Sequence, residues 1–194
     1  MLAEGELIAP TADEPAKQDF DHRVACVDFH IALRQWAEIA FVNVDWYHAD
    51  YDPVPGGKKG GRPSYKTTIS TGKRNIVPDA VFVYTDGAGT QRLYVLEMNM
   101  GNRPDRVVKK LLAYPPALRS QAIQRTYGFA FGARILSVFE TDEALEKVRS
   151  RLVEQHSEAF TDVGQLFFFK TMAAVHEHFY QGWKRLVDGE TRLL

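Results

Sequence analysis

Two apolar segments joined by a short turn constrain the fold of this chain most strongly. Residues 75–87 read NIVPDAVFVYTDG and residues 91–99 read QRLYVLEMN. Both are rich in β-branched and aromatic residues, which favours strands. The connecting Asp86-Gly87-Ala88-Gly89 is a turn sequence, so the segments are predicted to pair as an antiparallel hairpin. Polar and apolar residues alternate only weakly in 91–99, which indicates a strand covered on both faces.

Helices and further strands surround this hairpin in a regular order. Apolar residues recur at helical spacing from about residue 22 to residue 40, at Val24, Val27, Ile31, Leu33 and Ile39. Strands are predicted at 41–50, 129–139 and 163–171, and helices at 104–113 and 142–157. Strands separated by crossover helices predict an α/β sandwich with a mixed sheet.

Length and composition limit the class of protein. The 194 residues suit one domain, and the single cysteine, Cys26, excludes an internal disulfide framework. No apolar run approaches the ~20 residues that span a bilayer. The N-terminus lacks the basic start and apolar run of a signal peptide. We therefore expect a cytoplasmic protein with a flexible acidic tail, residues 1–21, before a single domain, residues 22–194.

The formal net charge of −1 hides an uneven distribution of charge. Residues 1–21 carry six acids and one base, a net −5, which leaves +4 for the rest of the chain. Residues 56–74 carry six bases and no acid, and such a glycine-rich loop is suited to phosphate contacts, although a solvated loop is the alternative. The residues predicted to contact nucleic acid are Lys58, Lys59, Arg62, Lys66, Lys73 and Arg74, with Lys109 further along the chain.

Two carboxylates occupy unusual places in the hairpin. Asp79 follows Pro78 at the start of the first strand, and Glu97 lies near the end of the second. An acid in such a strand is costly unless it is solvated, paired or metal-bound. Symmetric pairing about the turn places the two acids opposite each other, where they can share a hard divalent cation. The alternative is structural: Asp79 caps a turn, and Glu97 pairs with a lysine.

These residues resemble the motif of the PD-(D/E)XK nuclease superfamily. Pro78-Asp79, a hairpin and Glu97-Met98-Asn99 follow its motif, and its core has the order helix, three strands, helix, strand. The resemblance implies a restriction-endonuclease-like three-layer sandwich, in which helices flank a central mixed β-sheet. It also implies that Asp79 and Glu97 bind Mg²⁺ or Mn²⁺, and that Glu38 in the first helix is an auxiliary acid.

The chain departs from this motif at one catalytic position. Asn99 stands where the superfamily has a lysine, and an amide cannot supply its positive charge. In some members the lysine comes from the next helix, which here offers Lys109 and Lys110. The implied catalytic set is Asp79, Glu97, Asn99 and Lys110, and Tyr114 shares the helical face of Lys110. A basic helix surface is the other interpretation of the two lysines.

A second resemblance covers most of the chain. Segments of it are similar to the replication-relaxation family: HRVACVDFHIAL (22–33), IVPDAVFVY (76–84), YVLEMNMGN (94–102), KKLLAY (109–114), RILSVFET (134–141), LFFFKT (166–171) and GWKRLVDG (182–189). Members are associated with plasmid replication, DNA relaxation and mobilisation. The resemblance implies DNA as a partner, together with other plasmid-processing or mobilisation proteins.

These observations lead to three hypotheses about function. The first is metal-assisted phosphodiester hydrolysis in plasmid or mobile-element DNA. The second is a non-catalytic DNA-binding or relaxosome accessory protein on a decayed nuclease fold, and Asn99 favours it. The third is a protein-interaction module in which the acids are structural.

Overall fold

A mixed sheet of seven strands forms the centre of the computed structural model, which describes residues 13–59, 62–72, 74–101, 103–130, 132–187 and 190–193. The strands are β1 (Asn43–Ala49), β6 (Ala80–Thr85), β7 (Gln91–Asn99), β8 (Ala133–Phe139), β9 (Phe167–Thr171), β10 (Trp183–Arg185) and β11 (Glu190–Thr191), in that order across the sheet. The β1–β6 and β6–β7 pairs are antiparallel, β7–β8 and β8–β9 are parallel, and β10 pairs antiparallel with β9 and β11. The predicted mixed α/β sheet is confirmed.

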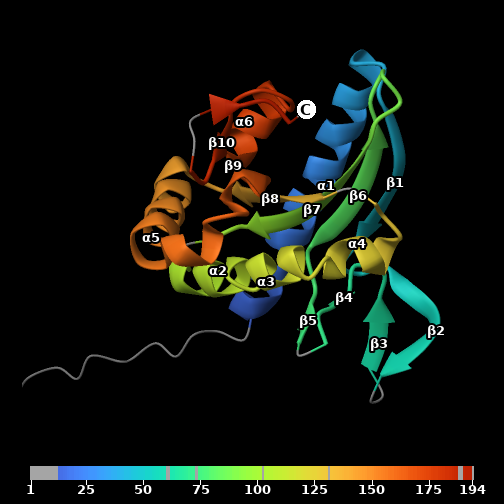
Figure 1. Ribbon diagram of the computed structural model, residues 1–194, viewed down its shortest axis with the longest axis horizontal. Helices are drawn as coiled ribbons and strands as arrows, with labels where there is room; N and C mark the ends of the chain where they lie inside the picture. Colours follow the sequence, from blue (N-terminus) through green and yellow to red (C-terminus); the bar gives the residue numbers. More distant parts are fainter. Residues whose placement is uncertain are drawn as a thin grey trace, which may run out of the picture.

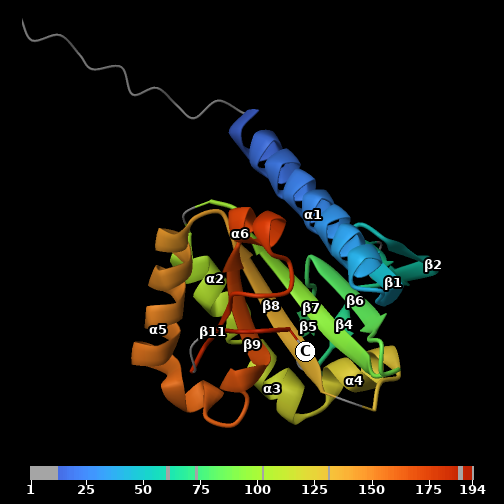
Figure 2. The ribbon, with the colours of Figure 1, turned by 90° about the horizontal axis from the view of Figure 1, so that it is seen from above.

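Helices cover both faces of this sheet, so the protein has three layers (Figures 1 and 2). One face packs against α1 (Asp13–Ile39) and α6 (Met172–Glu177). The other packs against α2 (Pro104–Leu111), α3 (Tyr114–Arg119), α4 (Ala122–Tyr127) and α5 (Asp142–Phe160). A 3₁₀ turn, η1 (Gly164–Leu166), leads into β9. Each face has its own apolar core, which explains why β7 is buried on both sides.

The central hairpin has the predicted register. Ala80 pairs with Leu96 and Thr85 with Gln91, which places Asp79 opposite Glu97. Gly89 adopts a φ of +80°, which favours glycine, and its N–H donates to the carbonyl of Asp86. The turn at residues 86–89 therefore fixes the register of the hairpin, and this register places Asp79 and Glu97 opposite each other.

The first helix differs from its prediction in two ways. It begins at Asp13, so residues 13–21 of the expected tail are helical, and residues 1–12 lie outside the described residues. Its larger apolar side chains do not all face the sheet: Val24, Val27 and Ile31 are 41%, 45% and 49% exposed. The buried face instead consists largely of small residues with Phe29 and Leu33, because alanines allow the helix to pack closely on the sheet.

The basic segment 56–74 is not simply a loop. Its backbone contributes to two small hairpins: β2 (Pro53–Lys59) pairs with β3 (Arg62–Tyr65), and β4 (Ile69–Ser70) pairs with β5 (Asn75–Ile76). The β2–β3 hairpin projects from the body of the protein (Figure 1). Ile69 and Ile76 are buried in the core under α4, which anchors the segment to the sheet.

The C-terminal region contains two strands that were not predicted. β10 and β11 follow α6 and contain only three and two residues, too few to produce a periodic pattern. None of the helices in the described part of the chain combines the length and apolar character needed to cross a bilayer.

Candidate functional site

The Asp79 carboxylate lies where the two helical layers meet the end of the sheet. It is almost fully buried, just before β6, and its Oδ2 accepts a hydrogen bond of 2.7 Å from the Met98 N–H. His22 Nε2, from α1 on one face, lies 3.3 Å from Asp79 Oδ1. Lys110 Nζ, from α2 on the other face, lies 3.2 Å from the same oxygen. One carboxylate thus links three elements that are distant in sequence.

Glu97 lies behind Lys110 and is fully buried. Alternate residues of β7, including Leu93 and Val95, point into the core beneath α2–α5, and Glu97 continues this series. Its carboxylate forms an ion pair with Lys110 Nζ and accepts a hydrogen bond from the Tyr114 hydroxyl. The structure therefore brings together the predicted residues Asp79, Glu97 and Lys110, and it adds Tyr114 as a direct contact of Glu97.

This arrangement does not fit a cation shared by Asp79 and Glu97. The Lys110 ammonium group forms ion pairs with both carboxylates and so occupies the place expected for the metal ion. Pairing of Glu97 with a lysine was the structural alternative to a metal site. The predicted metal pair is thus replaced by a buried cluster of two acids and one base.

Burial and charge shift the pKa values of this cluster in opposite directions. Burial acts to raise the pKa of Asp79, but the hydrogen bond from His22 and the charge of Lys110 outweigh it and hold this pKa at about 2. Burial raises the pKa of Glu97 to about 8, although Lys110 opposes the shift. Burial acts to lower the pKa of Lys110, but Glu97 and Asp79 raise it overall. Asp79 and Lys110 are therefore both charged at neutral pH.

A polar cleft of about 480 Å³ opens beside Asp79. Lys110 and Asp79 reach its wall, and Glu97 does not. Two exposed arginines that were not predicted, Arg103 and Arg106, line the same cleft at the start of α2. The cleft therefore combines acidic groups at the end of the sheet with guanidinium groups suited to phosphate oxygens.

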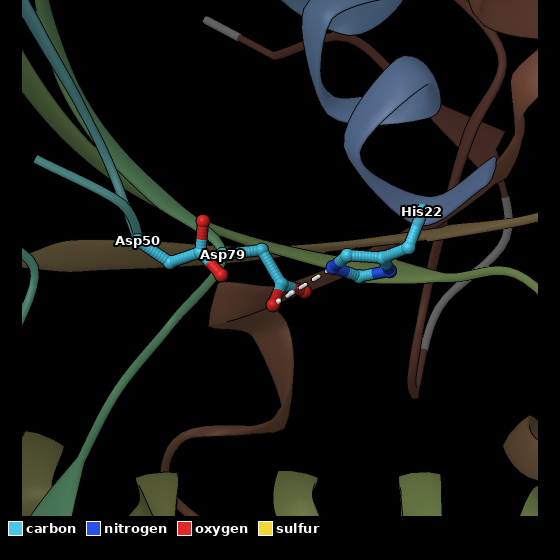
Figure 3. Close-up of side chains that lie close together, drawn as sticks. All are labelled: His22, Asp50 and Asp79. Carbon is cyan, nitrogen blue, oxygen red and sulfur yellow. Dashed lines mark ion pairs between the residues drawn. The ribbon is translucent and has the colours of Figure 1, made fainter. Parts of the chain in front are cut away.

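Asp50 is a second acid that the sequence analysis missed. Ala49 at the end of β1 pairs with Ala80 at the start of β6, and the Asp50 N–H donates to the Asp79 carbonyl at 2.9 Å. Asp50, Asp79 and His22 each offer one ligand atom, and these atoms lie within 4.8 Å of one another (Figure 3). Burial raises the pKa of Asp50, and the nearby charge of Asp79 raises it further.

The Asn99 amide is used to join two strands. Its Nδ2 donates to Ser137 Oγ at 2.8 Å, to the Val138 carbonyl at 3.2 Å and to the Glu97 carbonyl at 3.1 Å. Asn99 also lines the cleft. It therefore tethers β7 to β8 beneath the cleft and contributes no positive charge.

Glu38 does not belong to the site, contrary to the prediction. It is exposed near the C-terminal end of α1, whereas His22 touches Asp79 from the N-terminal half of the same helix. Sixteen residues of helix separate them, a distance of about 24 Å. The part of α1 that lies next to Asp79 is therefore the part that carries His22, and Glu38 lies far from it.

The predicted nucleic-acid contacts are only partly described. Lys66, Arg74 and Lys109 are exposed. Lys58, Lys59 and Arg62 belong to β2 and β3, but their side chains lie outside the described part of the structure, as does all of Lys73.

Replacing Asp79 with asparagine is expected to destabilise the protein by about 2 kcal/mol at pH 7. The pKa of Asp79 is about 2 in the fold and 3.8 ordinarily, so its ionisation stabilises the fold above pH 4. This contribution disappears as the pH falls towards 2. Urea unfolding of D79N and wild type at pH 7 and pH 3 tests this, with exposed Asp21→Asn as control. Equal stabilities at pH 7 would contradict the assigned contacts.

Comparisons with known proteins complete the description of the site. The chain matches no protein-family model, no curated protein and no solved structure. The two resemblances drawn from its motifs therefore stay predictions.

Proposed function

We propose that this protein is a nuclease-like domain that binds DNA and hydrolyses phosphodiester bonds with a divalent cation. The observation that carries the proposal is the convergence of Asp79, Glu97 and Lys110 from two adjacent strands and a helix, beside a polar cleft. The cleft also presents Arg103 and Arg106. Clustered, perturbed titratable groups in a cleft are the usual mark of a functional site.

The strand arrangement supports a restriction-endonuclease-like fold. Within the seven-stranded sheet, α1 is followed by three antiparallel strands, β1, β6 and β7, with the short hairpins β2–β3 and β4–β5 inserted between β1 and β6; helices α2–α4 then lead to β8, parallel to β7. This is the order of helix, three strands, helix and strand that the PD-(D/E)XK resemblance implies. Asp79 directly precedes the second of these strands and Glu97 lies in the third, close to the positions of the two motif acids, while Asn99 replaces the motif lysine.

In this proposal Lys110 is the group that faces the phosphate. Its side chain is about one-third exposed, and a fixed ammonium charge in a partly dry cleft stabilises negative charge that develops on a phosphodiester. Glu97 and Tyr114 act through Lys110: they hold its ammonium group from behind and are positioning residues. A divalent cation would have Asp79, on the cleft wall, rather than Glu97 among its ligands, and it would supply further positive charge for the phosphodiester and lower the pKa of water.

DNA is the proposed phosphodiester because two exposed arginines line the cleft and further exposed bases lie elsewhere on the protein. Arg103 and Arg106 flank the cleft, and Lys66, Arg74 and Lys109 are exposed. Contacts of this type bind the backbone of DNA and weaken steeply with salt. The proposed role, as the replication-relaxation resemblance implies, is in processing plasmid or mobile-element DNA, alongside other plasmid-processing or mobilisation proteins.

A second candidate function is a non-catalytic DNA-binding accessory protein. Two observations favour it: Asn99 replaces the motif lysine and ties β7 to β8, and Lys110 neutralises the carboxylates that a metal ion would bind. In this case the same cleft and bases bind DNA without cutting it.

A cleavage and binding assay separates the two candidates. Supercoiled, linear and branched DNA are incubated with wild type, Asp79→Asn and the control Asp21→Asn, in Mg²⁺ and in Mn²⁺. We expect wild type and Asp21→Asn to cleave at least one substrate, and Asp79→Asn to be about 100-fold slower or worse. Salt-sensitive binding without cleavage by any protein would favour the accessory role. Absence of both would overturn the proposed function.

A further inference from the structure

Three side chains from three elements surround one point at the edge of the cleft. His22 projects from α1, Asp50 follows β1 and Asp79 precedes β6. Figure 3 shows the His22 imidazole facing the Asp79 carboxylate, with Asp50 beyond Asp79 in this view. None of the three ligand-atom separations exceeds 4.8 Å. Glu97 is not part of this group: it contacts Lys110 and Tyr114, in the other helical layer.

The distances suit a common metal ion. Metal–nitrogen and metal–oxygen bonds of about 2.1 Å place two ligand atoms 3.3 Å apart when the angle at the metal is about 100°. His22 Nε2 and Asp79 Oδ1 are separated by 3.3 Å and share a hydrogen bond in the structure, and a bound ion would replace the His22 proton between them. Two ligands of one ion lie at most about 4.2 Å apart, and the three ligand atoms all lie within 4.8 Å of one another.

The positive charges near this group offset only part of its negative charge. Burial and Asp79 raise the pKa of Asp50 overall, although the charges of His22, Arg23 and Lys110 act to lower it. Lys110 forms ion pairs with Asp79 and Glu97. Among the residues that the structure describes, by contrast, none forms an ion pair or hydrogen bond with the Asp50 carboxylate, although it lies beside Asp79. Two neighbouring carboxylates repel each other unless a cation or a proton lies between them. A bound cation would therefore balance the charge of Asp50.

We propose that His22, Asp50 and Asp79 bind one divalent transition-metal ion, and that Glu97 is not a ligand. A histidine nitrogen beside two carboxylates favours metals such as Mn²⁺ or Zn²⁺ over Mg²⁺, which prefers oxygen ligands and retained water. Asp79, Asp50 and His22 all line the cleft, so further coordination positions are open to water or phosphate. The role of this ion in cleavage rests on the proposed function, but its binding does not.

Calorimetric titration with Mn²⁺ tests the site without any cleavage. We expect wild type to bind one Mn²⁺ and to bind Mg²⁺ more weakly. His22→Gln and Asp50→Asn each remove one ligand and are expected to weaken Mn²⁺ binding by about tenfold or more. His30→Gln and Asp28→Asn are matched controls on α1, with the same changes in chemistry, and should bind Mn²⁺ like wild type. Thermal unfolding of every variant without metal checks that each is folded.

The Glu97→Gln variant distinguishes the new site from the motif site. It is expected to retain Mn²⁺ binding within about threefold, because Glu97 is not among the three ligands, whereas a site shared by Asp79 and Glu97 would lose it. Electron spin-echo spectroscopy of Mn²⁺ in the wild type adds a test that needs no variant, since a bound imidazole gives a nitrogen coupling. We expect this coupling in wild type and its absence in His22→Gln.

The outcomes separate this inference from the proposed function. Absence of Mn²⁺ binding to wild type, or its loss in Glu97→Gln but not in His22→Gln, would overturn the site. If DNA is still cleaved in that case, the proposed function stands without the site. If Mn²⁺ binds through His22 and Asp50 but no DNA is cleaved, the site stands and the nuclease function fails.

Discussion

Replacing Lys110 with methionine is expected to lower the free energy of unfolding by about 3 kcal/mol at pH 7, because it removes one partner of a buried ion pair. Lys110 is the ion-pair partner of both Asp79 and Glu97. Asp79 would keep its contacts with His22 and the Met98 N–H, which limits the loss. Glu97 would add little to it at pH 7, because its pKa of about 8 already keeps it largely protonated there. Urea unfolding monitored by circular dichroism measures the difference.

Lys109→Met is the matched control for this experiment. Lys109 is the preceding residue of the same helix and is exposed, so its replacement is expected to change stability by no more than about 0.5 kcal/mol. At pH 9, where Glu97 is ionised in the wild type, the double variant Lys110→Met/Glu97→Gln should recover part of the loss, since it also removes the acid left without its base. Equal stability of Lys110→Met and Lys109→Met would show that the buried ion pairs do not form.

Replacing Glu97 with glutamine is expected to stabilise the protein at alkaline pH, on the order of 2 kcal/mol at pH 9. The pKa of Glu97 is about 8 in the fold and 4.5 ordinarily. Between these values the folded state holds a proton that the unfolded state has lost, so Glu97 makes the wild type less stable as the pH rises through this window. Glutamine does not titrate, and the stabilisation should therefore vanish at pH 4.5.

Free energies of unfolding at pH 4.5, 7 and 9 measure this effect. Glu38→Gln serves as the control, because it makes the same chemical change at an exposed position of α1. Its stability should follow that of wild type at all three pH values. A Glu97→Gln profile parallel to that of wild type would contradict the raised pKa of Glu97.

The hairpin could be predicted because residues close together in the sequence determine its turn and its register. The turn at 86–89 fixes a symmetric register, and that register places Asp79 opposite Glu97. The contribution of Lys110 could also be predicted from the sequence, because Lys110 lies in the helix that directly follows the strand that carries Glu97. Within this part of the chain, neighbouring elements in sequence are also neighbours in space.

The remaining site residues depend on contacts between distant elements. His22 reaches Asp79 because of the direction in which α1 crosses the sheet. The small residues of α1 that pack on the sheet set this direction, and the apolar periodicity of the helix does not reveal it. The same crossing leaves Glu38 far from the site. Asp50 had one usable signal: it directly follows a strand, as Asp79 directly precedes one. Their pairing was hidden because four short strands separate β1 from β6 in sequence.

Nicking of supercoiled plasmid DNA in Mn²⁺ by wild type and by Glu97→Gln measures whether cleavage depends on Lys110 held in place by Glu97. Glu97→Gln suits this measurement because we expect it to remain folded, so a lost activity reports on the positioning of Lys110. At pH 8.5, where Glu97 is largely ionised and pairs with Lys110, we expect wild type to nick the plasmid and Glu97→Gln to be about 100-fold slower, with both proteins fully folded. Equal rates for the two proteins, or no nicking by wild type, would contradict this expectation.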